Sequence, residues 1–270
     1  MTSSFAALPM YPFAGLRDAW DELYSAIAVS MRVSYPDTPL ELDWEVDSHE
    51  GWRHPHLAVS QACGWPLITE LHSTVRVLGA FEHRLDDAVS HLYRSVIVAR
   101  SALVPNALKD RAAINSTDSL SGCISLLAAF DIAPGHWPGE VVLTGSHLAS
   151  IDAVRTGSAD VASIDALSWA YQQRLDPHRL DGLVVVERGP LVPCLPLIVG
   201  VDADDAKVAA WRSAIGAAMS APSLVGVRSL LLIEGFVPLE LGDYQSALAP
   251  LAGTAALHSD ARTLGRTKEP

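Results

Sequence analysis

The stretch that decides the fold reads Ala112-Ala113-Ile114-Asn115-Ser116-Thr117-Asp118-Ser119-Leu120-Ser121-Gly122, and an apolar segment, 123–130, follows it. The small apolar residues predict a short buried strand, and the Ser/Thr/Asp run after them is typical of a helix start. The first N–H groups of a helix lack intrahelical acceptors and lie at the positive end of its dipole. The hydroxyl groups of Ser119 and Ser121 add donors, and Gly122 lets an anion approach the backbone closely. Together these features predict a site for phosphate, phosphonate, sulfate or carboxylate that needs no Lys or Arg. The alternative is a helix cap with spare serines.

Two further strand-to-helix turns follow this one along the chain. The segment 141–150 runs from a β-like stretch into a helix start that contains His147, and the segment 158–165 ends at Asp165. Successive strand ends that carry Ser, His and Asp fit an open α/β sheet, whose ligands bind beyond the carboxyl ends of the strands. Asp165 has two interpretations: it faces a donor group on the ligand, or it caps the helix that begins after it.

The rest of the chain alternates between short apolar runs and helix-like stretches. Strands are predicted at 4–11, 40–44, 56–61, 74–80, 95–99, 112–115, 140–144, 161–164, 182–187 and 196–201. Amphipathic helices are predicted at 15–31, 150–156, 167–174 and 206–219, with 228–233 either strand or helix. Strands separated by helices of this length predict βαβ units, and hence an α/β fold with mainly parallel sheets.

Composition excludes several classes of protein. The 270 residues carry 19 Lys and Arg against 31 Asp and Glu, a net charge of −12, so nucleic-acid binding is not expected. No apolar run is long enough for membrane insertion. Cys63, Cys123 and Cys194 form no CxxC pair, so neither a disulfide framework nor a zinc site is expected. The N-terminus lacks the regions of a secretory signal, so the sequence as it stands predicts a cytoplasmic protein, and a periplasmic one if the true start lies upstream.

The order of these motifs resembles a known family. Ser119-Leu120-Ser121-Gly122, Gly145-Ser146-His147 and Asp160-Val161-Ala162 with Asp165 are similar to segments of the phosphate/phosphite/phosphonate-type solute-binding proteins of ABC transporters. Ser60-Gln61-Ala62-Cys63-Gly64, Tyr93-Arg94-Ser95 and Met10-Tyr11-Pro12 resemble the same family, so the likeness covers nearly the whole chain. It implies a type II periplasmic-binding-protein-like fold of two lobes with an interlobe cleft. Residues 1–95 and 197–270 would form lobe one, and 96–196 would form lobe two with the anion-binding helix start.

The resemblance also implies roles for individual residues. Ser119, Ser121 and the Gly122 region would hold an anionic head group, His147 would donate to it, and Asp165 would face an amine or hydroxyl of the ligand. The remaining ligand-binding residues are expected to be Tyr11, Ser60, Gln61, Tyr93, Asn115 and Trp169. The sequence departs from the family pattern at Leu120, where a hydroxyl residue is usual, and at Asp165, where a Glu is usual. The identity of the ligand therefore stays open.

The function implied is a substrate-binding protein that closes around a small anion for ABC-type transport or sensing. We expect a monomer without cofactor or metal, whose partners are the ligand and a permease. The alternative is a cytoplasmic enzyme on the same fold, similar to chorismate dehydratases or pyrimidine-precursor synthases. Either Ser119 or Ser121 can be drawn with His147 and Asp165 as a catalytic triad, but no G-x-S-x-G motif occurs. His54-Pro55-His56 is interpreted as a solvated turn rather than a metal site.

Overall fold

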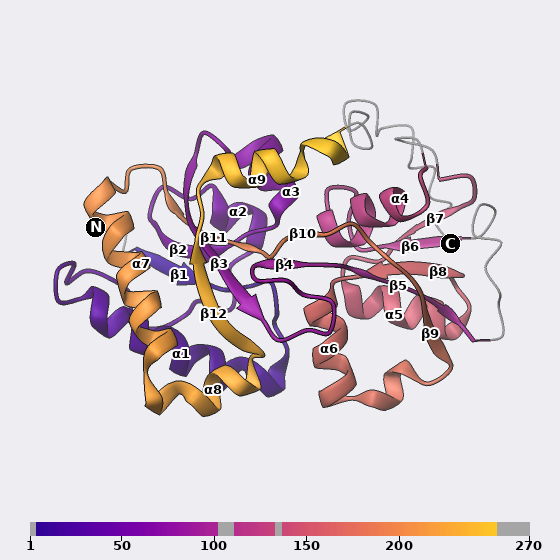
Figure 1. Ribbon diagram of the computed structural model, residues 1–270, viewed down its shortest axis with the longest axis horizontal. Helices are drawn as coiled ribbons and strands as arrows, with labels where there is room; N and C mark the ends of the chain where they lie inside the picture. Colours follow the sequence, from indigo (N-terminus) through magenta and orange to yellow (C-terminus); the bar gives the residue numbers. More distant parts are fainter. Residues whose placement is uncertain (1–3, 102–110, 133–136, 253–270) are drawn as a thin grey trace. The chain divides into compact units, whose positions relative to one another are not determined.

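The computed structural model describes residues 4–101, 111–132 and 137–252, and the chain divides into two units (Figure 1). Unit 1 is formed by the described residues up to Leu92 together with Pro193–Ser246, and unit 2 by Tyr93–Val192 with the described residues from Ala247. The chain passes between the units in β4 (Leu92–Tyr93) and β10 (Val192–Pro193), which pair with each other, and α9 (Leu241–Leu248) contains the third boundary.

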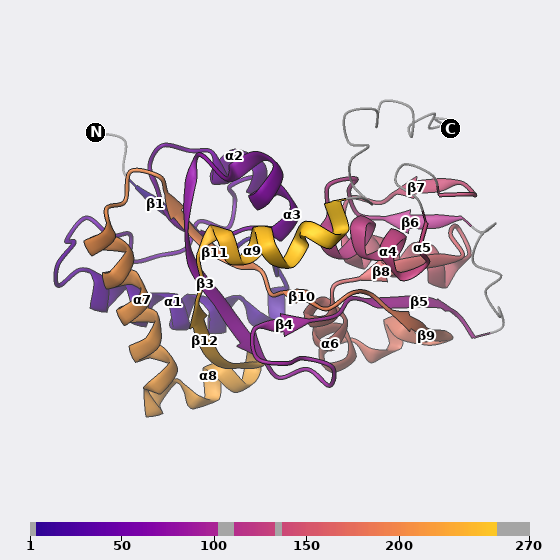
Figure 2. The same cartoon turned by 45° about the horizontal axis from the view of Figure 1, so that its top comes forward.

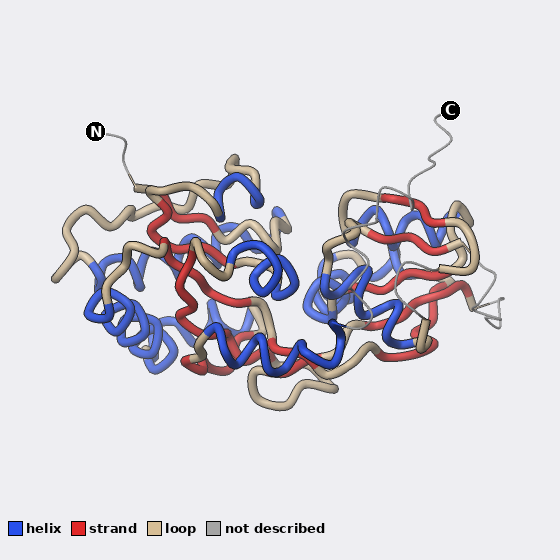
Figure 3. Tube along the Cα trace, turned by 90° about the horizontal axis from the view of Figure 1, so that it is seen from above, coloured by secondary structure: helices blue, strands red, loops and turns tan. Residues whose placement is uncertain are grey.

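Unit 1 contains a five-stranded sheet in the order β1-β2-β11-β3-β12. Its strands are β1 (Phe5–Ala7), β2 (Leu57–Gln61), β3 (Val75–His83), β11 (Pro196–Gly200) and β12 (Ile233–Pro238). Its helices are α1 (Arg17–Met31), α2 (Ser48–Trp52), α3 (Gly64–Pro66), α7 (Asp205–Ser220) and α8 (Val225–Leu230). Helix α1 packs against α7 and α8, and α7 also contacts strands β3 and β12 of this sheet. Figure 3 shows the chain as a tube, with helices in blue beside strands in red. The buried side chains of α1 include Trp20, Leu23 and Ile27, at the spacing of one helix face.

Unit 2 contains a second five-stranded sheet in the order β7-β6-β8-β5-β9, which can be followed in Figure 2. Its strands are β5 (Val96–Arg100), β6 (Ala112–Ile114), β7 (Val141–Leu143), β8 (Val161–Ile164) and β9 (Leu183–Arg188). Helices α5 (His147–Thr156) and α6 (Ala166–Leu175) contribute to a core with Val96 and Val98. Helix α4 (Ser125–Ala129) shares a second core with Ile97, so α4 covers the opposite face of the sheet.

The predicted α/β class is confirmed, and the elements agree with the sequence pattern over most of the chain. The expected parallel pairing occurs in β1–β2, β6–β7 and β6–β8. Strands β3, β11 and β12 of unit 1, and β5 and β9 of unit 2, run antiparallel to their neighbours, so both sheets are mixed. The lobe boundaries and the cleft stay predictions.

Three element predictions were wrong in detail. The segment 40–44 forms no strand; it is bent, and Trp44 instead donates from Nε1 to Asp21 Oδ1 at 2.9 Å. The segment 228–233 splits, because α8 ends at Leu230, Leu232 adopts φ 53°, and β12 begins only at Ile233. The first strand covers Phe5–Ala7 rather than 4–11.

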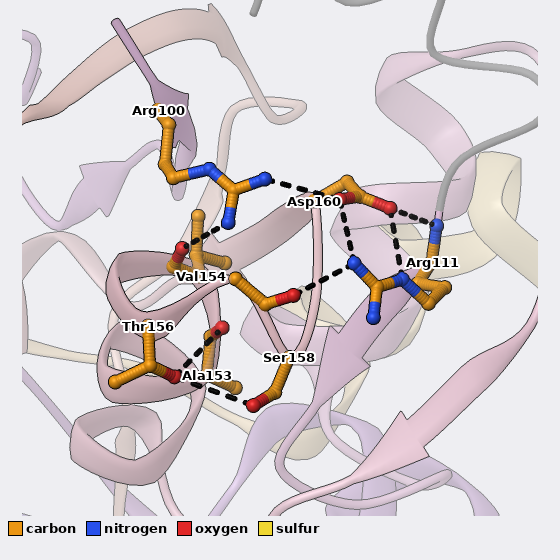
Figure 4. Close-up of polar contacts among 8 residues, drawn as sticks. Arg100, Arg111, Ala153, Val154, Thr156, Ser158 and Asp160 are labelled. Carbon is orange, nitrogen blue, oxygen red and sulfur yellow. Dashed lines mark hydrogen bonds and ion pairs between the residues drawn. The ribbon is translucent and has the colours of Figure 1, made fainter. Parts of the chain in front are cut away.

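Two arginines of unit 2, Arg100 and Arg111, bind Asp160 near the C-terminal end of α5 (Figure 4); this group is called the arginine clamp below. Arg111 binds both carboxylate oxygens of Asp160, from Nε to Oδ2 at 3.1 Å and from Nη2 to Oδ1 at 3.0 Å. Arg111 Nη2 also donates to the carbonyl oxygen of Gly157 at 2.7 Å, while Arg100 approaches Asp160 Oδ1 at 3.5 Å. Gly157 ends α5 in the left-handed conformation, φ 85°, and a β-carbon there would collide with the Arg100 guanidinium. The clamp therefore joins β5, β6 and the end of α5.

We predict that Asp160→Asn lowers the free energy of unfolding at pH 7 by about 1–2 kcal/mol, because charge-assisted hydrogen bonds to Arg111 are lost. Hydrogen bonds from Arg111 hold the pKa of Asp160 below its ordinary value, so this stabilisation is present above an Asp's usual pKa and is lost as the pH falls through the lowered one. Urea unfolding at pH 7 and near pH 3 checks this. Arg155→Ala, which removes an exposed pair with Asp152, is the control and should cost under about 1 kcal/mol. An Asp160→Asn deficit that is equally large at both pH values would contradict the clamp's role.

Candidate functional site

The first turn of the candidate site begins at Ser119, where β6 has ended and a helical run starts. Ser119 is the N-cap: its Oγ accepts from the backbone N–H of Gly122 at 3.0 Å. Its carbonyl oxygen accepts from the N–H groups of both Cys123 and Ile124 at 3.0 Å, because Leu120–Ile124 is wound as a π-helical turn before α4 continues it. The predicted helix start is therefore present, with the buried hydroxyls of Ser119 and Ser121 beside it.

Gly122 is required here for a different reason from the one expected from sequence. A β-carbon at this position would collide with Oδ1 of the Asn115 side chain, which fills the space. Asn115 Oδ1 is itself buried and has no hydrogen-bond partner among the described residues. The glycine thus admits Asn115 to the turn, and the backbone approach that we expected an anion to make is occupied by this side chain.

The second turn meets the first through a hydrogen bond between side chains. Ser146 caps α5 by accepting from Ala149 N–H at 3.1 Å, which places His147 as the first residue of the helix. His147 Nε2 lies 2.9 Å from Ser121 Oγ. Ser163 in β8 donates from Oγ to the carbonyl oxygen of Ser121 at 2.5 Å, so a third segment holds the same residue. Ser163 was missed from the sequence, although a fully buried Ser inside an apolar strand is a usable signal.

The surroundings of His147 favour the neutral form of its ring. Burial lowers the pKa of His147, and the Asp165 carboxylate and the Ser163 backbone carbonyl oppose that effect to a lesser extent. Nδ1 of the ring makes no hydrogen bond of normal geometry among the described residues. In its neutral form the ring makes one hydrogen bond with Ser121 and adds no positive charge to the turn.

The third turn is built on Asp165, which is buried with 3% exposure at the end of β8. Oδ1 accepts from Ser168 N–H at 2.8 Å, so Asp165 caps α6, and Oδ2 accepts from the Tyr93 hydroxyl at 2.7 Å. The structure therefore contains the helix cap that one of the two interpretations of Asp165 predicted.

The geometry does not assemble a catalytic triad. Ser121 and His147 are within hydrogen-bond reach, but the Asp165 oxygens accept from Tyr93 and Ser168, and His147 Nδ1 has no hydrogen-bond partner in the part of the chain that the structure describes. Burial raises the pKa of Cys123 to about 12, with Asp118 adding to the effect, so this thiol stays protonated. Within the described ranges, no three His, Cys, Asp or Glu side chains gather as metal ligands would.

The remaining predicted residues lie elsewhere. Trp169 is buried in the hydrophobic core that α5 and α6 share with β5 and β8. Tyr11, Ser60 and Gln61 belong to unit 1 and are also buried. Tyr11 stacks on Trp20 with ring centroids 6.5 Å apart, and Gln61 ends β2. Their roles in ligand binding stay predictions.

We predict that the free energy of unfolding falls as the pH drops below about 6.5, with a contribution from His147 of up to about 1.4 kcal/mol per pH unit. The sign follows from the lowered pKa: the unfolded chain binds a proton at His147 before the folded chain does, so acid favours unfolding. His147→Gln should remove this part of the slope in urea unfolding between about pH 5 and pH 7.5. His178→Gln is the control, because that side chain is 90% exposed. Equal slopes for wild type and His147→Gln would show that folding does not lower the pKa of His147.

The described part of the chain contains no helix with the length and apolar character needed to cross a membrane. A search of curated proteins finds no match. Among solved structures, similarity extends over nearly the whole chain at low sequence identity. PhnD1 from Prochlorococcus marinus in complex with methylphosphonate has a TM-score of 0.66 and 15% identity, covering 93% of this chain and 97% of its own.

Two other solved structures show the same fold. A binding protein component of an ABC phosphonate transporter from Pseudomonas aeruginosa has a TM-score of 0.69 and 13% identity, with 97% of this chain and 93% of that chain covered. A Xanthomonas citri protein bound to chloride ion has a TM-score of 0.68 and 15% identity, with 93% and 99% covered. The family model for ABC-transporter phosphonate periplasmic substrate-binding proteins matches residues 60–244. The chain therefore belongs to this family of substrate-binding proteins, which are not enzymes.

Proposed function

We propose that the protein binds a small ligand with a phosphonate, phosphate ester or similar oxyanion head group at the helix start Ser119–Gly122, and that it delivers this ligand to an ABC permease. The observation that carries the proposal is the Ser121–His147 hydrogen bond, 2.9 Å long, at the first turn of a helical run. Membership of the family supports the solute-binding role and a permease partner. The periplasm is the compartment in the family's description, and we propose it for this chain.

Hydroxyl groups and the positive end of a helix dipole supply the proposed head-group site. The π-helical turn and α4 form one continuous run, Leu120–Ala129, whose dipole has its positive end at Ser119. Ser121 is 6% exposed, so an anion bound there would be largely removed from water, where hydrogen bonds to charge are stronger. His147 either accepts from Ser121 or donates to it, and in the second tautomer the Ser121 hydroxyl is free to donate to the anion.

Asp165 makes a bare oxyanion an unfavourable ligand. A carboxylate about 4 Å from a bound anion costs on the order of 1–4 kcal/mol, depending on the effective dielectric constant. The Asp165 carboxylate acts electrostatically on His147, which itself contacts Ser121. We therefore propose that the ligand carries an amine or a hydroxyl, whose donor group offsets the negative charge of the buried Asp165 carboxylate.

We predict that Ser119→Ala combined with Ser121→Ala raises the Kd for methylphosphonate by more than about tenfold, because one charge-assisted hydrogen bond is worth about 1.5–3 kcal/mol. Isothermal titration calorimetry measures this. The double variant also loses the Ser119 cap, which costs about 0.5–2 kcal/mol of stability. Asp204→Ala removes the cap of α7 in unit 1 and serves as the control, with lower stability but unchanged affinity. Unchanged affinity in the double variant would place the head group elsewhere.

We predict that 2-aminoethylphosphonate binds more tightly than inorganic phosphate. Asp165→Asn should lower the ratio of the Kd for phosphate to the Kd for 2-aminoethylphosphonate about tenfold, because a neutral amide attracts an ammonium group less than a carboxylate does. Competition titrations of both probes against wild type and variant give the ratio. Asp176→Asn, at the other end of α6, is the control that leaves the ratio intact. If phosphate binds as tightly as 2-aminoethylphosphonate and Asp165→Asn changes nothing, Asp165 is a helix cap only.

A further inference from the structure

Asn115 places a hydrogen-bond acceptor beside the turn of the proposed head-group site. The residue follows β6, and its backbone carbonyl oxygen accepts from the Gly145 N–H at 3.1 Å, so the strand end and the second turn fix its position. Its side-chain oxygen, Oδ1, lies where a β-carbon on Gly122 would be, and that place is 3.2 Å from Ser119 Oγ. All four residues belong to unit 2. Oδ1 therefore fills the space on one side of the turn.

An acceptor at this place limits the kind of anion that can bind beside it. Oδ1 is buried and makes no hydrogen bond to the residues that the structure describes. An amide oxygen is the negative end of a dipole and has no proton to give, so it repels an ionised oxygen of a ligand. A ligand oxygen that carries a proton donates to it instead. The position of Asn115 thus favours an anion that keeps one hydroxyl.

The charges near the turn act in the same direction. Asp118 adds to the effect of burial in raising the pKa of the Cys123 thiol, so its negative charge reaches the first turn. Asp165 acts on His147 in the same sense, although burial has the larger effect on that ring and lowers its pKa. Repulsion grows with the charge of the ligand. Both carboxylates therefore disfavour a dianion more than a monoanion.

We propose that Asn115 is a specificity-determining residue of the head-group site, and that the site selects the singly protonated form of a phosphonate or a phosphate ester. In this form the P–OH group donates to Asn115 Oδ1, and the ionised oxygens accept from the Ser121 hydroxyl. A sulfonate has no such proton and meets Oδ1 with an ionised oxygen. The inference rests on the proposed function, because it names the protonation state of the oxyanion that this site takes.

The first test compares methylphosphonate with methanesulfonate by isothermal titration calorimetry at about pH 6, where both are monoanions of similar shape and only the phosphonate has a hydroxyl. In the wild type methylphosphonate should bind at least about tenfold more tightly, as expected where a site pairs a hydroxyl of its ligand. Asn115→Leu, of similar size and without polar side-chain atoms, should bring the affinity ratio close to one. Asn115→Asp should keep the preference, because a carboxylate also accepts.

The control for these variants is Thr144→Val. It loses the hydrogen bonds from Thr144 Oγ1 to the Ile114 carbonyl oxygen and with Ser150 Oγ, at the ends of the same two strands. This variant should be less stable than the wild type and should keep the wild-type affinity ratio.

The second test follows the affinity for methylphosphonate as its last proton is lost. The Kd should rise by up to about tenfold per pH unit above the second pKa of the ligand, measured between about pH 6 and pH 9. Groups near the turn titrate away from the upper part of this range, because burial lowers the pKa of His147, raises that of Tyr171 and raises that of Cys123 to about 12. The Kd for methanesulfonate, which does not titrate there, reports any change in the protein itself.

The outcomes separate this inference from the head-group proposal. Ser121→Ala should weaken both probes alike, and its failure to do so contradicts the head-group site while the Asn115 ratio can still be read. Equal affinity for the two probes in the wild type, an unchanged ratio in Asn115→Leu, or a Kd for methylphosphonate that stays constant or falls with rising pH overturns the role of Asn115. Loss of the preference in Asn115→Asp also overturns it, since the amide would then donate from Nδ2. Absence of binding by both probes contradicts the site and this inference together.

Discussion

The hydrogen bond between Ser121 and His147 joins the turns on which the proposed site depends. Ser121 belongs to the helical run after β6, and His147 begins α5 after β7. Because β6 and β7 are parallel neighbours, their carboxyl ends lie together, and this bond fixes the two helix starts against each other. Ser163 adds β8 to the same point through the carbonyl oxygen of Ser121. Residues in or directly after three adjacent strands thus hold Ser121 in a defined place.

Burial sets the charge of this region. Desolvation lowers the pKa of His147 and so favours its neutral form, and the carboxylate that opposes this effect, Asp165, accepts hydrogen bonds from Tyr93 and from the start of its own helix. A site of this kind binds an anion through dipoles and hydroxyl groups rather than through a fixed cation, so the affinity depends on exact placement of donors. Arg100 and Arg111 of unit 2 bind Asp160 near the C-terminal end of α5, so they stabilise the fold and are not part of the proposed anion site.

The sequence predicted the elements whose signals are local. Ser119, Ser146 and Asp165 all cap helices, and Gly157 ends α5, as their residue types indicate. The segment 40–44 forms no strand: Asp43 N–H donates to the carbonyl oxygen of Ala6 in β1, but the segment stays bent, and strand pairing depends on distant segments that the local pattern does not reveal. The π-helical turn at Leu120–Ile124, the occupation of the Gly122 position by Asn115 and the Asp160 clamp also arise from contacts between separate segments. Only the structure reveals them.

The central claim is that an oxyanion binds at the helix start Ser119–Gly122. A crystal structure of the protein with methylphosphonate tests it most directly. The account predicts phosphonate oxygens within hydrogen-bond distance of Ser121 Oγ at the start of the helix, with His147 still in contact with Ser121. A phosphonate group held at another part of the chain, with the Ser121–His147 pair unoccupied, would contradict it.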